Sequence, residues 1–114
     1  MLLRYLVAFA LTLAVEVPLY TLWLWSALSV PAGRAAGLAV LVNVVTHPVL
    51  WWSLALWSVG RAEYPYVLTG AEIVACVVEW ALLRWRLRCT SPLLAFIVVG
   101  VNAASLAAGL LVNV

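Results

Sequence analysis

Four long apolar runs dominate the pattern of hydrophobic and polar positions along the chain. Each holds about 20 residues with few charges, and together they cover residues 2–25, 36–57, 66–83 and 92–112. A helix of about 20 apolar residues matches the ~30 Å hydrocarbon layer of a bilayer. The sequence therefore predicts an all-α, polytopic membrane protein with four transmembrane helices.

The segments between the apolar runs are short and rich in residues that favour turns. They include Ser29, Pro31, Gly60, Pro65 and Ser91. Short connections make consecutive helices antiparallel neighbours. We therefore expect two helical hairpins that form one transmembrane domain over residues 1–114.

The first apolar run has some features of a signal peptide, because Arg4 precedes it and small residues follow it. Its core over residues 6–24 is longer than an ordinary signal core and contains Glu16. We therefore expect a retained transmembrane helix.

The composition agrees with a bilayer as the main solvent. Hydrophobic residues make up 68% of the chain and charged residues 9%, against ~50% and ~25% in an average soluble domain. The positive charge comes from six Arg and no Lys, and these Arg form no surface stripe of the kind that binds nucleic acid. The lipid bilayer is the expected partner, and nucleic acid is not.

The distribution of Arg predicts how the chain lies in the cell membrane. Four Arg belong to the first and third connections, and two belong to the opposite side: Arg34, Arg84, Arg86 and Arg88 against Arg4 and Arg61. Arg-rich connections stay in the cytoplasm, so both termini are expected on the non-cytoplasmic side. The Arg84–Arg88 stretch is interpreted as a topological anchor, with anionic-lipid binding as the alternative.

Three of the four acidic residues, Glu16, Glu72 and Glu79, lie inside predicted spans, and no Arg lies deep in a span to neutralise them. A charged side chain at the centre of a membrane helix costs about 2.5 to 3.5 kcal/mol on the insertion scale. The carboxyls are therefore expected either to be protonated or to share a cation.

Helical spacing brings these acids into one layer with a histidine. Glu72 and Glu79 are seven residues apart and share a face of the third helix, as Asn43 and His47 do on the second. Glu16, His47, Glu72 and Glu79 all lie within roughly 6 Å of the middle of their spans, at 1.5 Å rise per residue. Pro18 and Pro48 each free a backbone carbonyl nearby. These four side chains are the predicted ligands of a cation.

Helices two and four each carry an amide followed by a hydroxyl, Asn43 with Thr46 and Asn102 with Ser105. Such residues support a site or join helices by hydrogen bonds. Together with Glu16 aligned on Glu79, they indicate a weak internal repeat of one hairpin, related by an axis along the membrane normal.

The motif Asn43-Val-Val-Thr-His47-Pro48, with Glu16 before it and Glu72, Glu79 and Asn102 after it, resembles one in small uncharacterised prokaryotic membrane proteins that carry N-x-x-T-H-P in the second span. The resemblance covers most of the chain. It implies four helices and no established activity.

Three functions remain open from the sequence. The first is a cation site within the bundle, binding Zn, Fe or Mn or relaying a proton, because carboxylate and imidazole suit these ions. The second is a non-catalytic subunit of a larger membrane complex or homo-oligomer, with the polar residues serving helix packing. The third is an intramembrane enzyme acting on a lipid or isoprenoid, with a Glu as general acid or base. The sequence assigns no catalytic residue.

Overall fold

The computed structural model describes residues 2–56 and 64–112, and these form four α-helices. The helices are α1 (Leu2–Leu28), α2 (Ala32–Leu56), α3 (Tyr64–Leu87) and α4 (Pro92–Val112). Each contains one of the predicted apolar runs, so the all-α prediction with four helices is confirmed. Pro18 and Pro48 lie inside α1 and α2. The predicted end of the second run, residue 57, and Arg61 lie outside the described residues.

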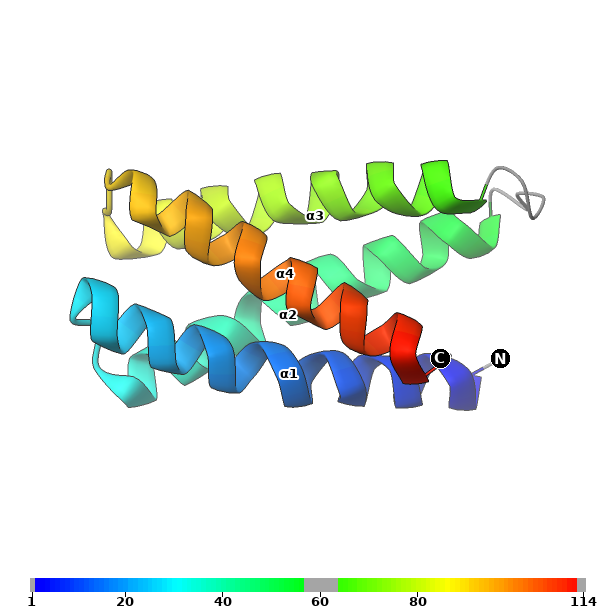
Figure 1. Ribbon diagram of the computed structural model, residues 1–114, viewed down its shortest axis with the longest axis horizontal. Coiled ribbons are helices and arrows are strands. Elements are labelled where there is room, and N and C mark those ends of the chain that lie inside the picture. Colours follow the sequence, from blue (N-terminus) through cyan, green and yellow to red (C-terminus); the bar gives the residue numbers. More distant parts are fainter. Residues whose placement is uncertain (1, 57–63, 113–114) are drawn as a thin grey trace.

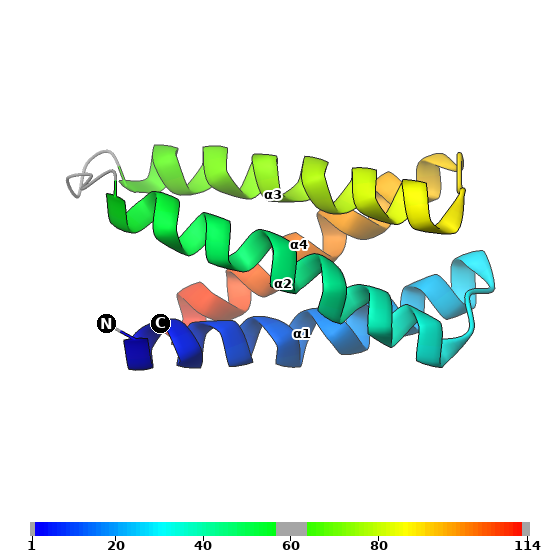
Figure 2. The ribbon, with the colours of Figure 1, turned by 180° about the vertical axis from the view of Figure 1, so that it is seen from behind.

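The four helices form a ring. Each packs against the helix before it and the helix after it in sequence, and the first and last helices pack against each other. α1 contacts α2 and α4, and α3 contacts the same two helices from the other side. Figures 1 and 2 show α1 and α3 running in the same direction, with α2 crossing between them on one face and α4 on the other. Both termini lie at one end of the bundle. α1 and α3 are therefore diagonal partners.

Two of the three connections turn through a residue in the left-handed conformation. Ser29, after α1, has φ 57°, and Arg88, after α3, has φ 51°. Backbone bonds close both turns, from Val30 N to Leu24 O at 3.0 Å and from Cys89 N to Arg84 O at 3.3 Å. A left-handed residue at this place is a common helix stop because it turns the chain back on the last carbonyls. The two hairpins therefore begin their turns in the same way.

Many large apolar side chains lie on the outside of the bundle, and several polar side chains are buried within its apolar core. Large apolar side chains are exposed on all four helices, including Leu22, Val44, Val77 and Phe96. Acids and amides are buried instead, with Glu79 1% and Asn43 1% exposed. Two helical segments, Leu6–Leu28 and Pro92–Gly109, are long and apolar enough to cross a membrane.

The two hairpins repeat the same buried positions with a shift of 59 residues. Eight pairs of buried residues obey this shift: Glu16 and Ala75, Tyr20 and Glu79, Leu24 and Leu83, Ala35 and Leu94, Leu38 and Ile97, Ala39 and Val98, Val42 and Val101, Asn43 and Asn102. The left-handed residues Ser29 and Arg88 are 59 apart as well. In this register Tyr20 is the counterpart of Glu79. The predicted alignment, which paired Glu16 with Glu79, is therefore shifted by one helical turn from the packing of the helices.

Gly100 permits close packing of α4 against α1. A Cβ atom at this position would lie 3.0 Å from Cζ3 of Trp23. That distance is shorter than an ordinary van der Waals contact between carbons. Gly100 therefore lets the Trp23 ring approach the backbone of α4.

Candidate functional site

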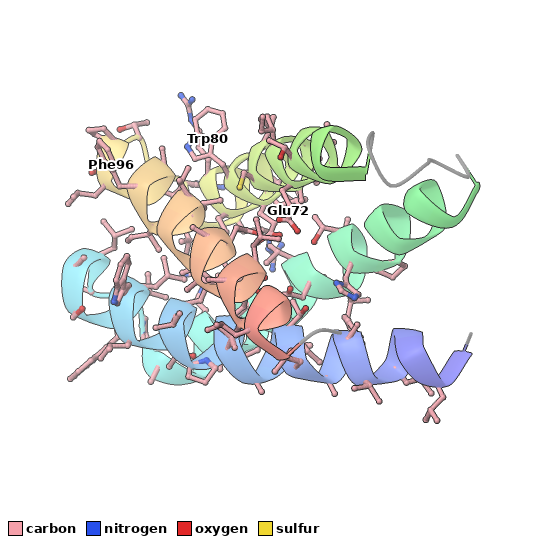
Figure 3. All side chains as sticks on the ribbon, turned by 45° about the vertical axis from the view of Figure 1, so that its right-hand side comes forward. Glu72, Trp80 and Phe96 are labelled. Atoms are coloured by element: carbon pink, nitrogen blue, oxygen red, sulfur yellow. The ribbon has the colours of Figure 1, made fainter. Side chains whose placement is uncertain are left out.

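The predicted polar side chains face the inside of the bundle. Six of the eight are buried and the other two, Glu72 and Ser105, are half-buried. The buried ones are Glu16, Asn43, Thr46, His47, Glu79 and Asn102. Figure 3 shows Glu72 directed inward from α3, whereas Phe96 points away from the bundle. One chain therefore covers its own polar residues without a partner.

Glu79 on α3 is the centre of a hydrogen-bond network that reaches all three other helices. The hydroxyl of Tyr20 on α1 donates to Glu79 Oε1 at 2.6 Å. Asn102 Nδ2 on α4 donates to the same oxygen at 3.2 Å, and Thr46 Oγ1 on α2 lies 3.1 Å from Oε2. Buried polar groups require such partners because burial removes them from bulk water. Glu79 therefore ties the four helices together.

The number of available protons favours a neutral carboxylic acid at Glu79. Thr46 has one hydroxyl proton, and its oxygen lies closer to Val42 O, at 2.8 Å, than to Glu79 Oε2. If Thr46 donates to Val42, a proton on Glu79 Oε2 completes the second bond, with the Thr46 oxygen as acceptor. None of the described residues forms an ion pair with Glu79. A neutral acid satisfies every partner without leaving an unpaired charge in a low-dielectric interior.

Tyr20 is the member of this hydrogen-bond network that the sequence analysis missed. It is fully buried, and besides donating to Glu79 its oxygen lies 3.4 Å from Asn102 Nδ2. A tyrosine in an apolar run resembles the interfacial aromatics of membrane proteins, so its type gives no signal. Its position does, because Tyr20 follows Glu16 by four residues and shares its helix face.

We predict that Tyr20→Phe lowers the free energy of unfolding by about 1 to 2 kcal/mol, the upper range for a hydrogen bond inside a membrane protein. The change removes only the hydroxyl that joins the diagonal helices α1 and α3. The measurement is reversible unfolding in mixed micelles. The control is Thr21→Val, since within the described residues the hydrogen bond of Thr21 Oγ1 is to Val17 O of its own helix, at 2.6 Å. Equal losses in the two variants would contradict a special role for the Tyr20 bond.

Glu16 on α1 is the second buried acid, and its environment is incomplete. The side chains of Asn43 and Ser105 are its polar neighbours, and Glu79 and Glu72 are close enough for their charges to act on it. Glu16 is 3% exposed, yet its Oε1 atom has no hydrogen-bond partner among the described residues. A buried acceptor without a donor costs about 1 to 3 kcal/mol. Glu16 is therefore the acid with an open position.

The two acids have matching surroundings. Glu79 is hydrogen-bonded to the hydroxyl of Thr46 on α2 and to the amide of Asn102 on α4. Glu16 lies beside the hydroxyl of Ser105 on α4 and the amide of Asn43 on α2. The shift of 59 residues that relates the hairpins exchanges Thr46 with Ser105 and Asn43 with Asn102. The pseudo-symmetric bundle therefore builds two half-sites, each with a carboxyl, an amide and a hydroxyl. The Asn side chains are held alike, by donation to Ala39 O and Val98 O at 2.8 and 2.9 Å.

The four predicted cation ligands do not assemble into one metal centre. The ring of His47 packs against Phe9 of α1, with the ring centroids 5.0 Å apart. Among residues 2–56 and 64–112, no three His, Cys, Asp or Glu side chains lie close enough to hold one metal ion. Cys76 and Cys89 are free thiols. The structure therefore gives no support to a Zn, Fe or Mn site formed by Glu16, His47, Glu72 and Glu79.

Glu16 and Glu72 lie nearer the terminal end of the bundle than Glu79 does. Glu16 lies about 6 Å from the level of Tyr20, and Glu72 about 10 Å from Glu79, by the helical rise. Both displacements run toward the end that carries the termini. On the other side of Glu79 the core is apolar, with Leu24, Leu83 and Leu94 fully buried. Glu16 and Glu72 are therefore the acids nearer the terminal end, and an apolar layer lies on the opposite side of Glu79.

Comparison with known proteins gives no family for the chain. No family model, no curated protein and no solved structure matches it. The resemblance to proteins with the N-x-x-T-H-P motif stays a prediction.

Proposed function

We propose that the chain is a four-span membrane protein whose interior binds an exchangeable cation at Glu16, and that this cation is a proton. The observation that carries the proposal is the buried Oε1 of Glu16, which has no hydrogen-bond partner in the described part of the chain, beside the fully bonded Glu79. An acceptor of this kind is completed by a proton or a small cation. The proton needs no further ligands, and no three-ligand group exists among the described residues.

The membrane placement rests on the exposed surface. Among residues 2–56 and 64–112, segments with the length and apolarity of a membrane span are found in α1 and α4 alone. α2 and α3 nevertheless present apolar faces of the same kind, with Val44 51% and Val77 57% exposed. At 1.5 Å per residue, α2 and α3 are about 37 and 36 Å long, sufficient to cross ~30 Å of hydrocarbon. We propose that all four helices cross, with both termini on the non-cytoplasmic side.

In this proposal the two half-sites have different tasks. Glu79 stays protonated and fixes the helices, because its bonds are complete. Glu16 takes up and releases the proton, because its Oε1 atom has no hydrogen-bond donor within the described helices unless a proton is bound. Glu72, half-buried on the same side of the layer and near Glu79, stands between Glu16 and the terminal end. Because the core beyond Glu79 is apolar, we propose that protons reach Glu16 from the terminal end of the bundle only.

The test is infrared difference spectroscopy of the reconstituted protein as the medium is made alkaline. In a Glu72→Gln background, which removes the half-buried third acid, we expect loss of a carboxylic acid band in the parent protein and in Glu79→Gln. We expect no such loss in Glu16→Gln, which keeps the shape of the side chain but cannot ionise. A pH-sensitive band that survives in Glu16→Gln and vanishes in Glu79→Gln would overturn the assignment. Equilibrium dialysis against Zn²⁺ on the same proteins distinguishes the metal alternative, which requires stoichiometric binding that Glu16→Gln abolishes.

A further inference from the structure

Four arginines gather at the end of the bundle opposite the termini. Arg34 begins α2, and Arg84 and Arg86 end α3, with Arg88 in the turn that follows. Arg34 Nη2 donates to the backbone oxygen of Arg86 at 2.9 Å, so the first and third connections meet here. All four side chains are exposed.

Aromatic rings hold two of these guanidinium groups at the outer surface of α3. The Arg84 guanidinium lies 5.2 Å from the Trp80 ring centre, and that of Arg86 lies 5.5 Å from the Trp85 ring centre. Stacking on a ring fixes a guanidinium through its face and leaves its N–H groups at the rim available. Trp85 is 69% exposed, and an exposed Trp at a span end suits the boundary between hydrocarbon and headgroups.

The positive charge at this end has no acidic partner within the described part of the chain. The contacts of these arginines are the bond to Arg86 O and the two ring contacts. The described acids, Glu16, Glu72 and Glu79, all lie within helices and away from the Arg34–Arg88 end. Like charges at short range repel one another. An external anion that bridges several guanidinium groups would remove that repulsion, and phosphate oxygens accept two parallel N–H bonds from each Arg.

We propose that this end of the bundle binds the phosphate group of anionic phospholipids through Arg34, Arg84, Arg86 and Arg88. Trp80 and Trp85 place the guanidinium groups at headgroup depth while their rings lie along the acyl chains. The inference rests on the proposed membrane placement but not on proton binding by Glu16. Each Arg near a leaflet rich in anionic lipid raises the affinity of a protein for that leaflet roughly five-fold.

The test uses the full chain in phosphatidylcholine vesicles with a small share of spin-labelled phosphatidylglycerol or, separately, spin-labelled phosphatidylcholine. We expect the wild type to immobilise the anionic lipid preferentially. The double variant Arg84→Gln/Arg86→Gln is expected to lower that preference about 25-fold at most, two factors of five. The matched control, Arg4→Gln/Arg61→Gln, removes the same charge elsewhere in the sequence and should leave the preference unchanged.

Three results would overturn the proposal: no lipid preference in the wild type, equal loss in the control variant, or displacement of the labelled lipid by millimolar inorganic phosphate, which would indicate a site for free phosphate. Salt provides a measurement on the unmodified protein, should the variants fold poorly. Raising the ionic strength should weaken the preference for the anionic lipid, because exposed charges are screened. A preference that does not respond to salt would also contradict the proposal. The carboxylic acid band of the Glu16 experiment is read independently of all these outcomes.

Discussion

Glu79→Ala is expected to lower the free energy of unfolding by roughly 3 kcal/mol, since three hydrogen bonds at about 1 kcal/mol each are lost inside the bundle. Tyr20, Thr46 and Asn102 all meet at this carboxyl, and Ala leaves the buried tyrosine hydroxyl without its acceptor. A buried donor without a partner is more costly than a missing bond between exposed groups. The loss should appear as a lower unfolding midpoint in mixed micelles.

Glu79→Gln separates the role of shape from the role of charge. If the carboxyl is neutral, the amide oxygen replaces Oε1 as acceptor and the amide nitrogen donates where the acid proton did, toward Thr46. We therefore expect the stability of Glu79→Gln to lie within about 1 kcal/mol of the wild type. The control Glu72→Ala removes a half-buried acid two turns away and should cost less than Glu79→Ala. If Gln is as harmful as Ala, Glu79 is a carboxylate and the bundle holds a cation near it.

Val77→Lys is expected to reduce membrane insertion of α3 by about 2.5 to 3.5 kcal/mol, or roughly 100-fold, on the insertion scale for charged residues at a helix centre. Val77 is 57% exposed and lies in the middle of α3. The proposed four-span arrangement turns this side chain toward lipid. Val44→Lys, in the middle of α2 with Val44 51% exposed, should have the same effect. The fraction of chains inserted is measured by glycosylation mapping of the flanking segments.

The control for both lysine variants is Trp85→Lys. Trp85 is exposed near the end of α3, where a lysine can extend its amine to the headgroups and bury its stem in hydrocarbon. We expect nearly normal insertion of this variant. If all three variants insert equally, α2 and α3 do not face hydrocarbon and the four-span proposal is wrong.

The sequence repeat was predicted by aligning Glu16 with Glu79, whereas the packed helices pair Tyr20 with Glu79. The alignment still identified two acids with equivalent neighbours, which form the two half-sites. The buried positions repeat with a shift of 59 residues, but the two acids are 63 residues apart. The extra four residues are about one turn of helix, or ~6 Å. Glu79 contacts Thr46 and Asn102. Glu16 has their counterparts in the other hairpin, Ser105 and Asn43, as polar neighbours. The acids thus lie on successive levels of one polar layer, close enough to influence each other's charge.

Local patterns determined much of this architecture. Apolar run length predicts α1 to α4, and short connections make the helices antiparallel, since both depend on residues near one another in sequence. The period of 3.6 residues indicates that Glu72 and Glu79 share a face, and the cost of burying a charge indicates that this face points inward. These inferences need no knowledge of how the helices are rotated against each other.

Tertiary structure alone decided which side chains meet. The rotation and vertical offset of four packed helices bring Tyr20 to Glu79 across the diagonal. They leave Glu16 Oε1 without a donor among the residues that the structure describes. They also pack the His47 ring against Phe9, and no group of three metal-ligating side chains forms among the described residues. A turn of one helix relative to its neighbour moves a polar atom by ~6 Å, twice the length of a hydrogen bond. Sequence spacing fixes faces to within a turn, so it identifies the acids, whereas their partners depend on packing between helices far apart in the chain.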